Sequence, residues 1–240
     1  MEAENWPESA VVFGSGGGIG AALCRELAAR GVRVRAGSRG GEAPEGCETF
    51  RFDLDVEASI AAAAEAMRGD PPDLVLVATG VLTLPDDTGP ERSLKALDGE
   101  AMARVLYVNT IGPALVAKHV LPLLPREGRS VFAVLSARVG SISDNRLGGW
   151  HSYRASKAAL NMLVRNFAIE MGRTHKRAVV VGLHPGTVDT PLSEPFQGNV
   201  KDGQLQTPEE SARHLLGVVD GLEPGDSGKV FDWRGEAIPA

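Results

Sequence analysis

Strand-like and helix-like stretches alternate along most of this chain, and that alternation limits the possible folds more than any other feature. Short apolar runs such as Ala10–Phe13 and Leu74–Ala78 predict strands, while Ile19, Leu23 and Leu27 recur at helical spacing after the first run. The alternation repeats about seven times. It therefore predicts an α/β fold with a doubly wound parallel sheet of about seven strands, right-handed crossovers and helices on both faces.

The remaining elements follow from the same patterns. One expected helix, 98–124, has a weak point at Gly112-Pro113. Another begins at Thr207, an N-cap residue followed by proline and two acidic residues. Further strands are expected at 32–36, 50–54, 130–135, 178–183 and near 230–231, and further helices at 57–68 and 150–173.

Length and composition favour a single domain. The 240 residues suit one α/β domain over 10–240, preceded by a flexible polar tail at 1–9. A net charge of -6 without a basic block argues against a nucleic-acid partner. No apolar run is long enough to span a bilayer, and the acidic start does not resemble a signal peptide. Cys24 and Cys47 form no metal-type cluster, so we expect a cytoplasmic protein without a metal.

A glycine-rich loop lies between the first expected strand and the first expected helix. A backbone that turns sharply there, approaches a pyrophosphate closely and directs free N–H groups at it requires glycine. A flexible turn is the simpler reading, but the position between strand and helix favours nucleotide binding on a Rossmann-type sheet. The loop residues expected to contact the nucleotide are Gly14, Ser15, Gly16, Gly18, Ile19 and Gly20.

The ends of the next two strands indicate which nucleotide binds. Enzymes that use NAD usually carry an acid after the second strand, whereas an arginine there suits the 2′-phosphate of NADP. This chain has Ser38-Arg39 and no acid until Glu42, so NADP(H) is preferred, with NAD(H) as the alternative. Asp53 and Leu54 end the third expected strand, where Asp53 is a candidate for the adenine edge.

Tyr153 and Lys157 are four residues apart on an expected helix, so their side chains share one face. An ammonium near a phenol favours the phenolate and is expected to lower the pKa of the tyrosine. Such a tyrosine can exchange a proton with a carbonyl or alcohol oxygen. Alone the pair is a weak signal, but behind a phosphate-binding loop it predicts an oxidoreductase acting on a small carbonyl or alcohol substrate.

With both motifs in place, the chain from Ala10 onward resembles the short-chain dehydrogenase/reductase family, and most closely its sniffer-like carbonyl reductase branch. The stretch 135–150, LSARVGSISDNRLGGW, is very similar to that branch's approach to the tyrosine. Val77-Ala78-Thr79-Gly80 occupies the place of the family's Asn-Asn-Ala-Gly turn, and the stretch 184–190, HPGTVDT, resembles its Pro-Gly cofactor loop.

The resemblance implies roles for individual residues. Tyr153 is the acid/base, and Lys157 tunes it and binds the nicotinamide ribose. Asn109 holds a helix bend and a water of the proton relay. Backbone groups near Val188 meet the nicotinamide carboxamide, and Thr190 meets the phosphates. The other cofactor residues implied are Ala78, Thr79, Gly80, Pro185 and Gly186. The family also implies a homodimer or homotetramer and a mobile lid at 191–200.

One position departs from the family pattern. Ala137 stands where the family has the second serine of Ser-Ser-x-x-Gly, which orients the substrate carbonyl. Ser136 and Ser141 are the candidates to replace it, although neighbouring side chains on a strand point to opposite faces. Losing one such donor typically slows turnover by about 10²–10³-fold. The departure supports an alternative hypothesis, a dinucleotide-binding signalling or scaffold protein with weak or vestigial catalysis.

Overall fold

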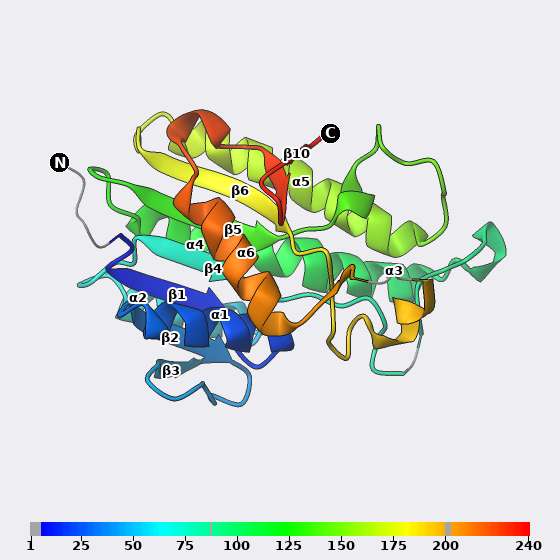
Figure 1. The fold of residues 1–240 in the computed structure, drawn as a ribbon, viewed down its shortest axis with the longest axis horizontal. Helices are drawn as coiled ribbons and strands as arrows, with labels where there is room; N and C mark the ends of the chain where they lie inside the picture. The colour runs from blue at the N-terminus through cyan, green and yellow to red at the C-terminus, as the bar shows by residue number, and fades with distance from the viewer. Residues whose placement is uncertain (1–5, 87, 200–202) are drawn as a thin grey trace.

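The computed structural model describes residues 6–86, 88–199 and 203–240, and in these residues an eight-stranded sheet forms the centre of the molecule (Figure 1). Seven strands are parallel, and only the last runs antiparallel to its neighbour. The predicted Rossmann-type sheet is therefore confirmed. From one edge to the other, its order is β10 (Ala237–Ile238), β9 (Val230–Asp232), β6 (Ala178–His184), β5 (Ser130–Leu135), β4 (Leu74–Val77), β1 (Ser9–Phe13), β2 (Arg33–Ser38) and β3 (Glu48–Arg51).

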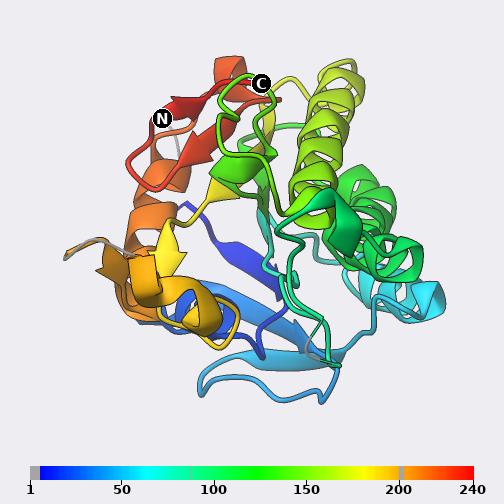
Figure 2. The same ribbon diagram turned by 90° about the vertical axis from the view of Figure 1, so that its right-hand side faces the viewer.

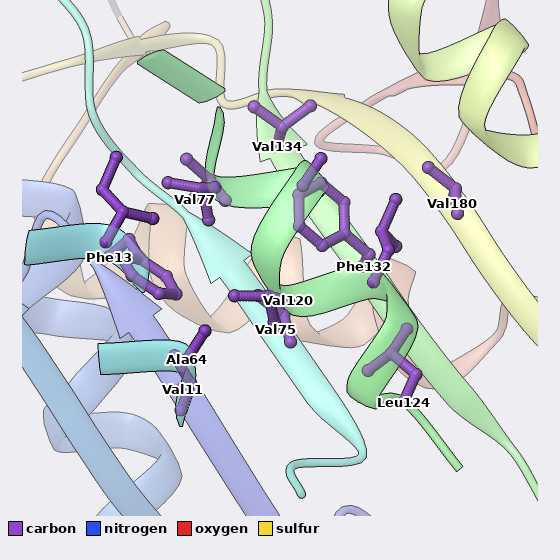
Figure 3. Close-up of a cluster of buried hydrophobic side chains, with 14 of the residues drawn as sticks. Val11, Phe13, Ala64, Val75, Val77, Val120, Leu124, Phe132, Val134 and Val180 are labelled. Atoms are coloured by element: carbon purple, nitrogen blue, oxygen red, sulfur yellow. The ribbon is translucent and has the colours of Figure 1, made fainter. Parts of the chain in front are cut away.

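Helices cover both faces of the sheet because alternate strand residues point to opposite sides. In β1, Ala10 and Val12 pack under α1 (Gly18–Ala29) and α6 (Pro208–Asp220), which lie in front in Figure 1. Val11 and Phe13 point to the other face, into the cluster of Figure 3. The helices of that face are α2 (Glu57–Ala66), α4 (Gly112–Val120) and α5 (His151–Met171).

The predicted helix at 98–124 is interrupted. It consists of α3 (Gly99–Leu106), a π-helical turn at Tyr107–Ile111, and α4. Pro113 has no N–H to donate four residues back, to the carbonyl of Asn109, so the regular ladder cannot continue across this point. The interruption of the helix near Gly112-Pro113 is therefore confirmed, and the distorted residues are Tyr107–Ile111, just before these two.

Two predicted boundaries were wrong. The third strand ends at Arg51 rather than at 54, because the Asp53 N–H bonds to the Ser59 hydroxyl and the chain turns into α2. The expected tail at 1–9 is too long, because β1 begins at Ser9 and the Trp6 indole lies 3.8 Å from the Arg129 guanidinium. Residues 1–5 lie outside the described residues.

The remaining segments gather at the end of the sheet where the parallel strands finish. Figure 2 looks onto this end, which is the side at which ligands bind in open α/β sheets. A small two-stranded sheet there joins the loop after β6 to the start of α6 through β7 (Thr187–Val188) and β8 (Leu205–Gln206). Short 3-10 turns complete the chain at Leu94–Ala96, Leu121–Leu123, Arg138–Gly140, Glu194–Asn199 and Pro224–Asp226.

Candidate active site

A cavity of about 510 Å³ opens at the carboxyl ends of β1, β2 and β4. Its size falls in the range of cofactor and ligand pockets. Among the residues named from the sequence, its lining includes Gly14, Gly16, Ser38, Arg39, Asp53, Leu54, Ala78, Thr79 and Gly80. The tertiary structure thus brings together the glycine loop, the second-strand arginine and the turn after β4 at one cleft.

Close backbone packing shapes the glycine loop. Gly14 has φ +98, and a Cβ there would lie 2.9 Å from the carbonyl carbon of Ala78. A Cβ on Gly20 would lie 2.1 Å from the Gly14 carbonyl oxygen. Ser15 is buried and donates its hydroxyl to the Gly37 carbonyl at 3.0 Å, so it holds the loop against β2. Ile19 packs against the apolar cluster beneath α1.

The residues of this cleft fit a phosphorylated dinucleotide. The loop leaves room that a side chain would fill, and it leads directly into the N-terminus of α1, which favours an anion. Arg39 is exposed at the rim. The Thr79 hydroxyl is buried in the cavity wall and has no hydrogen-bond partner among the described residues. An unpaired buried hydroxyl is unfavourable unless a ligand satisfies it.

The loop after β6, which carries the predicted residues Pro185, Gly186, Val188 and Thr190, does not line the cavity but lies against the glycine loop. A Cβ on Gly18 would lie 2.8 Å from Cγ2 of Thr190, so this loop touches the glycine loop. The Pro185 carbonyl accepts a hydrogen bond from the Gln206 amide at 3.1 Å. Gly186 has φ +78 and no room for a side chain beside Gln206. Val188 is buried, and its carbonyl accepts from the Ser193 hydroxyl at 2.5 Å.

Tyr153 and Lys157 lie in the first turns of α5, where Lys157 adjoins the wall of this cleft and Tyr153 lines a smaller neighbouring cavity with Leu84. The Lys157 Nζ lies 5.8 Å from the centre of the Tyr153 ring and donates to the Leu135 carbonyl at 2.9 Å. A Cβ on Gly80, a residue of the cavity wall, would lie 3.7 Å from that Nζ. Lys157 therefore links the cleft to the Tyr153 ring.

The electrostatics of the pair differ from the sequence-based expectation. Burial raises the pKa of Tyr153 to about 12 in the free protein, so the expected lowering by Lys157 is not present there. Burial also lowers the pKa of Lys157 to about 8. Both shifts have one cause, because each charged form loses solvation in the protein. The phenol is thus neutral at working pH, as a proton donor must be.

Asn109 is fully buried in the π-helical turn and links three elements. Its Oδ1 accepts from the Val81 N–H at 2.8 Å, and its Nδ2 donates to the Val81 carbonyl and to the Ser156 hydroxyl. It therefore ties the helix distortion to the turn after β4 and to α5. Its role in a proton relay stays a proposal.

The two serines considered as replacements at Ala137 both have structural partners. The Ser136 hydroxyl hydrogen-bonds Oδ1 of Asn161 at 2.6 Å, farther along α5 than Lys157. The Ser141 hydroxyl accepts from the Asp144 N–H at 3.1 Å and stabilises the loop that follows. Ala137 itself is buried. Each serine hydroxyl would therefore have to break an existing hydrogen bond before it could orient a substrate.

The sequence motifs assigned no role to three further residues of the site. The Trp150 ring lies 6.2 Å from that of Tyr153 and 5.2 Å from that of Phe196. Phe196 belongs to the expected lid at 191–200. Val200, the last residue of that range, lies outside the described residues. Glu91 is buried and binds the Ser152 N–H and hydroxyl. Burial opposes ionisation of Glu91, but these hydrogen bonds outweigh it and hold its pKa below the ordinary value.

Two further classes of site find no support among the described residues. No group of three or more His, Cys, Asp or Glu side chains within 6–86, 88–199 and 203–240 is placed to hold a metal ion. Within the same ranges, no helix combines the length and apolar character that crossing a bilayer requires.

A doubly wound sheet whose glycine loop and Tyr–Lys pair meet at one cleft is the arrangement of a dinucleotide-dependent oxidoreductase. The short chain dehydrogenase family model matches residues 8–200. The chain therefore belongs to the short-chain dehydrogenase family, as the sequence motifs predicted.

Comparisons with individual proteins agree with this assignment. The chain is 34% identical to 1-hydroxy-2-glutathionyl-2-methyl-3-butene dehydrogenase of Rhodococcus sp., over 91% of this chain and 93% of that one. It is 38% identical to C-signal of Myxococcus xanthus, over 61% of this chain and 83% of that one. The NADPH-bound carbonyl reductase from chicken fatty liver superposes with a TM-score of 0.79 at 26% identity, covering 97% and 94%. Sniffer of D. melanogaster, at 19% identity, 97% and 99% coverage and a TM-score of 0.82, shares the fold.

Proposed function

We propose that this protein is an NADP(H)-dependent oxidoreductase that interconverts a small carbonyl compound and its alcohol. The observation that carries the proposal is the position of the Lys157 amine, which lies beside the Tyr153 ring and next to the wall of the cleft that holds the glycine loop and Arg39. The NADPH bound to the chicken carbonyl reductase of the same fold supports the choice of cofactor. The test is turnover of NADPH with a panel of aldehydes and ketones. Tight NADPH binding without turnover of any of them would contradict the proposal.

In this proposal the bound nicotinamide supplies or accepts the hydride. Tyr153 donates the phenol proton to the carbonyl oxygen during reduction and takes it back during oxidation. Lys157 holds a positive charge near the phenol and is placed to bind the nicotinamide ribose. Asn109 fixes the position of α5 through Ser156, so the Tyr153 hydroxyl stays in place. Closure of the segment after Thr190 would exclude water from the reacting atoms.

The protonation of Lys157 predicts a pH dependence. With a pKa of about 8, its amine is charged below pH 8 and neutral above it. Reduction should therefore be fastest below pH 8 and decline above it, because the neutral amine no longer assists proton transfer from Tyr153. A pH–rate profile between pH 6 and 10 measures this. In Lys157→Arg, whose side chain stays charged, any remaining activity should lack the decline. The same transition in both proteins would assign it to another group.

Arg39 predicts the cofactor preference. Arg39→Ala should raise KM for NADPH by about 10–100-fold, because one charge-assisted bond to the 2′-phosphate is lost. KM for NADH should hardly change, since NADH has no phosphate at that position. Steady-state kinetics with the two cofactors checks the result. Equal changes for both would place Arg39 outside the phosphate site.

A second candidate function is signalling through dinucleotide binding, with little or no catalysis. It is favoured by Ala137, where the family has a serine, and by similarity to a protein named C-signal. Ala137→Ser should increase carbonyl turnover by about 10²–10³-fold if the missing donor limits the wild type. Little or no change would show that the site already works without that hydroxyl. Turnover that appears only in the variant would favour the signalling hypothesis.

We also propose a homodimer or homotetramer built through α5 and its neighbour. Met162 and Ile169 are seven residues apart on α5, so they share one helix face. Both are largely exposed, as is Ile111 just before α4. Exposed apolar side chains on α5 and in the turn before α4 suit contact with a second subunit.

A further inference from the structure

The residue before α5 has a backbone conformation that its side chain disfavours. Trp150 has φ 50 and ψ 44, and it is the only non-glycine residue with positive φ in the described part of the chain. The two residues before it, Gly148 and Gly149, are also left-handed. Glycine or asparagine tolerates this conformation far better than a bulky aromatic residue does. The requirements of the helix start therefore do not explain a tryptophan here.

The surrounding structure fixes Trp150 in place. Its N–H donates to the Glu91 carbonyl at 2.5 Å, and the Glu91 carboxylate binds both the N–H and the hydroxyl of Ser152. Glu91 is buried and comes from the loop after β4. A strained residue that its neighbours hold rigidly is typical of sites where the conformation serves function.

The Trp150 side chain connects the proposed proton donor to the lid. Its ring meets the Tyr153 ring edge-on, with 6.2 Å between centres and an angle of 74° between planes. It also meets the Phe196 ring, with 5.2 Å between centres and 64° between planes. Tyr153 lies on α5, whereas Phe196 lies in the 3-10 turn Glu194–Asn199. Two aromatic side chains from distant segments thus form one wall beside the phenol.

From this arrangement we infer that Trp150 and Phe196 bind the aromatic ring of an aryl ketone or benzylic alcohol beside Tyr153. The inference rests on the proposed function, whose substrate class it specifies. Aromatic rings prefer edge-on and offset packing against one another, and this wall presents such surfaces next to the group that handles the carbonyl oxygen. Because Ala137 supplies no hydroxyl to orient that oxygen, packing of the ring takes a larger part in positioning the substrate.

The test uses two methyl ketones that differ only in the second substituent, acetophenone and butan-2-one. In Trp150→Gly, KM for acetophenone should rise about tenfold, since the favourable ring contact is lost. KM for butan-2-one should stay within about twofold. The midpoint of thermal unfolding should change little, because the relief of the left-handed strain offsets the loss of the ring contacts with Tyr153 and Phe196. Phe196→Ala, which leaves Trp150 intact, should likewise raise KM for acetophenone more than KM for butan-2-one. Trp6→Phe, which lies far from the site, should change neither KM.

A purely structural role for Trp150 predicts a different pattern. If the Trp150 ring only supported the fold, its removal would change both KM values by a similar factor, and that result would overturn the inference. If Trp150→Gly does not fold, Trp150→Asn, which also tolerates the left-handed conformation, takes its place.

A binding measurement separates this inference from the proposed function. Acetophenone cannot be reduced in the complex with NADP⁺, so calorimetric titration of that complex reports binding alone. Weaker binding by Trp150→Gly than by the wild type supports the aromatic wall even if no carbonyl compound is turned over. Equal binding by the two proteins overturns it, whether or not the enzyme is active.

Discussion

Tyr153→Phe is expected to lower carbonyl reduction by about 10²–10⁴-fold, the range that one positioned proton donor supplies. The substitution removes a single hydroxyl and keeps the ring that packs on Trp150 at 6.2 Å. The fold and the affinity for NADPH should therefore stay unchanged. Initial rates at saturating NADPH, together with fluorescence titration of NADPH binding, separate the two effects.

The chain offers a matched control in Tyr107, its other tyrosine. The Tyr107 hydroxyl donates to the Leu54 carbonyl at 3.0 Å and takes no part in the proposed chemistry. Tyr107→Phe should cost about 1 kcal/mol of unfolding free energy and leave turnover nearly intact. If Tyr153→Phe retains wild-type turnover, the proposed mechanism is wrong.

Gly20→Ala is expected to weaken NADPH binding by about 100-fold, the same factor that a misplacement of about 1 Å can cost in catalytic rate. The new Cβ would lie 2.1 Å from the Gly14 carbonyl oxygen and 3.2 Å from Cα of Ser15. Both neighbours are backbone atoms, so the loop itself must move. We also expect a loss of about 1–3 kcal/mol in unfolding free energy from this overpacking. Fluorescence titration with NADPH and urea unfolding measure the two quantities.

Gly217→Ala is the matched control for Gly20→Ala, because the same substitution is expected to stabilise the protein there. Gly217 lies within α6, and a Cβ there meets nothing within 4 Å. Alanine should therefore stabilise the protein by about 0.5–1 kcal/mol, through helix propensity, without altering NADPH affinity. Equal effects of the two substitutions would mean that the packing of Gly20 against Gly14 is unimportant for binding.

The fold could be predicted from the sequence because its signals are local. Apolar runs such as Leu74–Ala78 and the helical spacing of Leu23 and Leu27 depend on residues a few positions apart. The boundaries were less predictable. The hydroxyl of Ser59 ends the third strand earlier than the apolar pattern indicates, and Arg129 holds Trp6 although 123 positions separate the two residues. Both contacts depend on how the chain folds back on itself.

The same distinction holds within the candidate site. The glycine loop could be predicted because a phosphate requires free backbone N–H groups at a helix start. The electrostatics of Tyr153 could not, because burial by distant segments, rather than its sequence neighbour Lys157, sets its pKa in the free protein. Glu91 gave no signal at all, since a single acid in a loop shows its role only when it meets Ser152.

The sequence by itself determined the class of fold and predicted the glycine loop and the Tyr153–Lys157 pair, because each depends on residue types at short, fixed spacings. Only the tertiary structure decided which side chains surround that pair. It placed Phe196 against Trp150, gave Ser136 a partner in Asn161, and held Trp150 in a left-handed conformation through Glu91. These contacts join residues many positions apart, so they exist only once the loops have closed over the carboxyl end of the sheet.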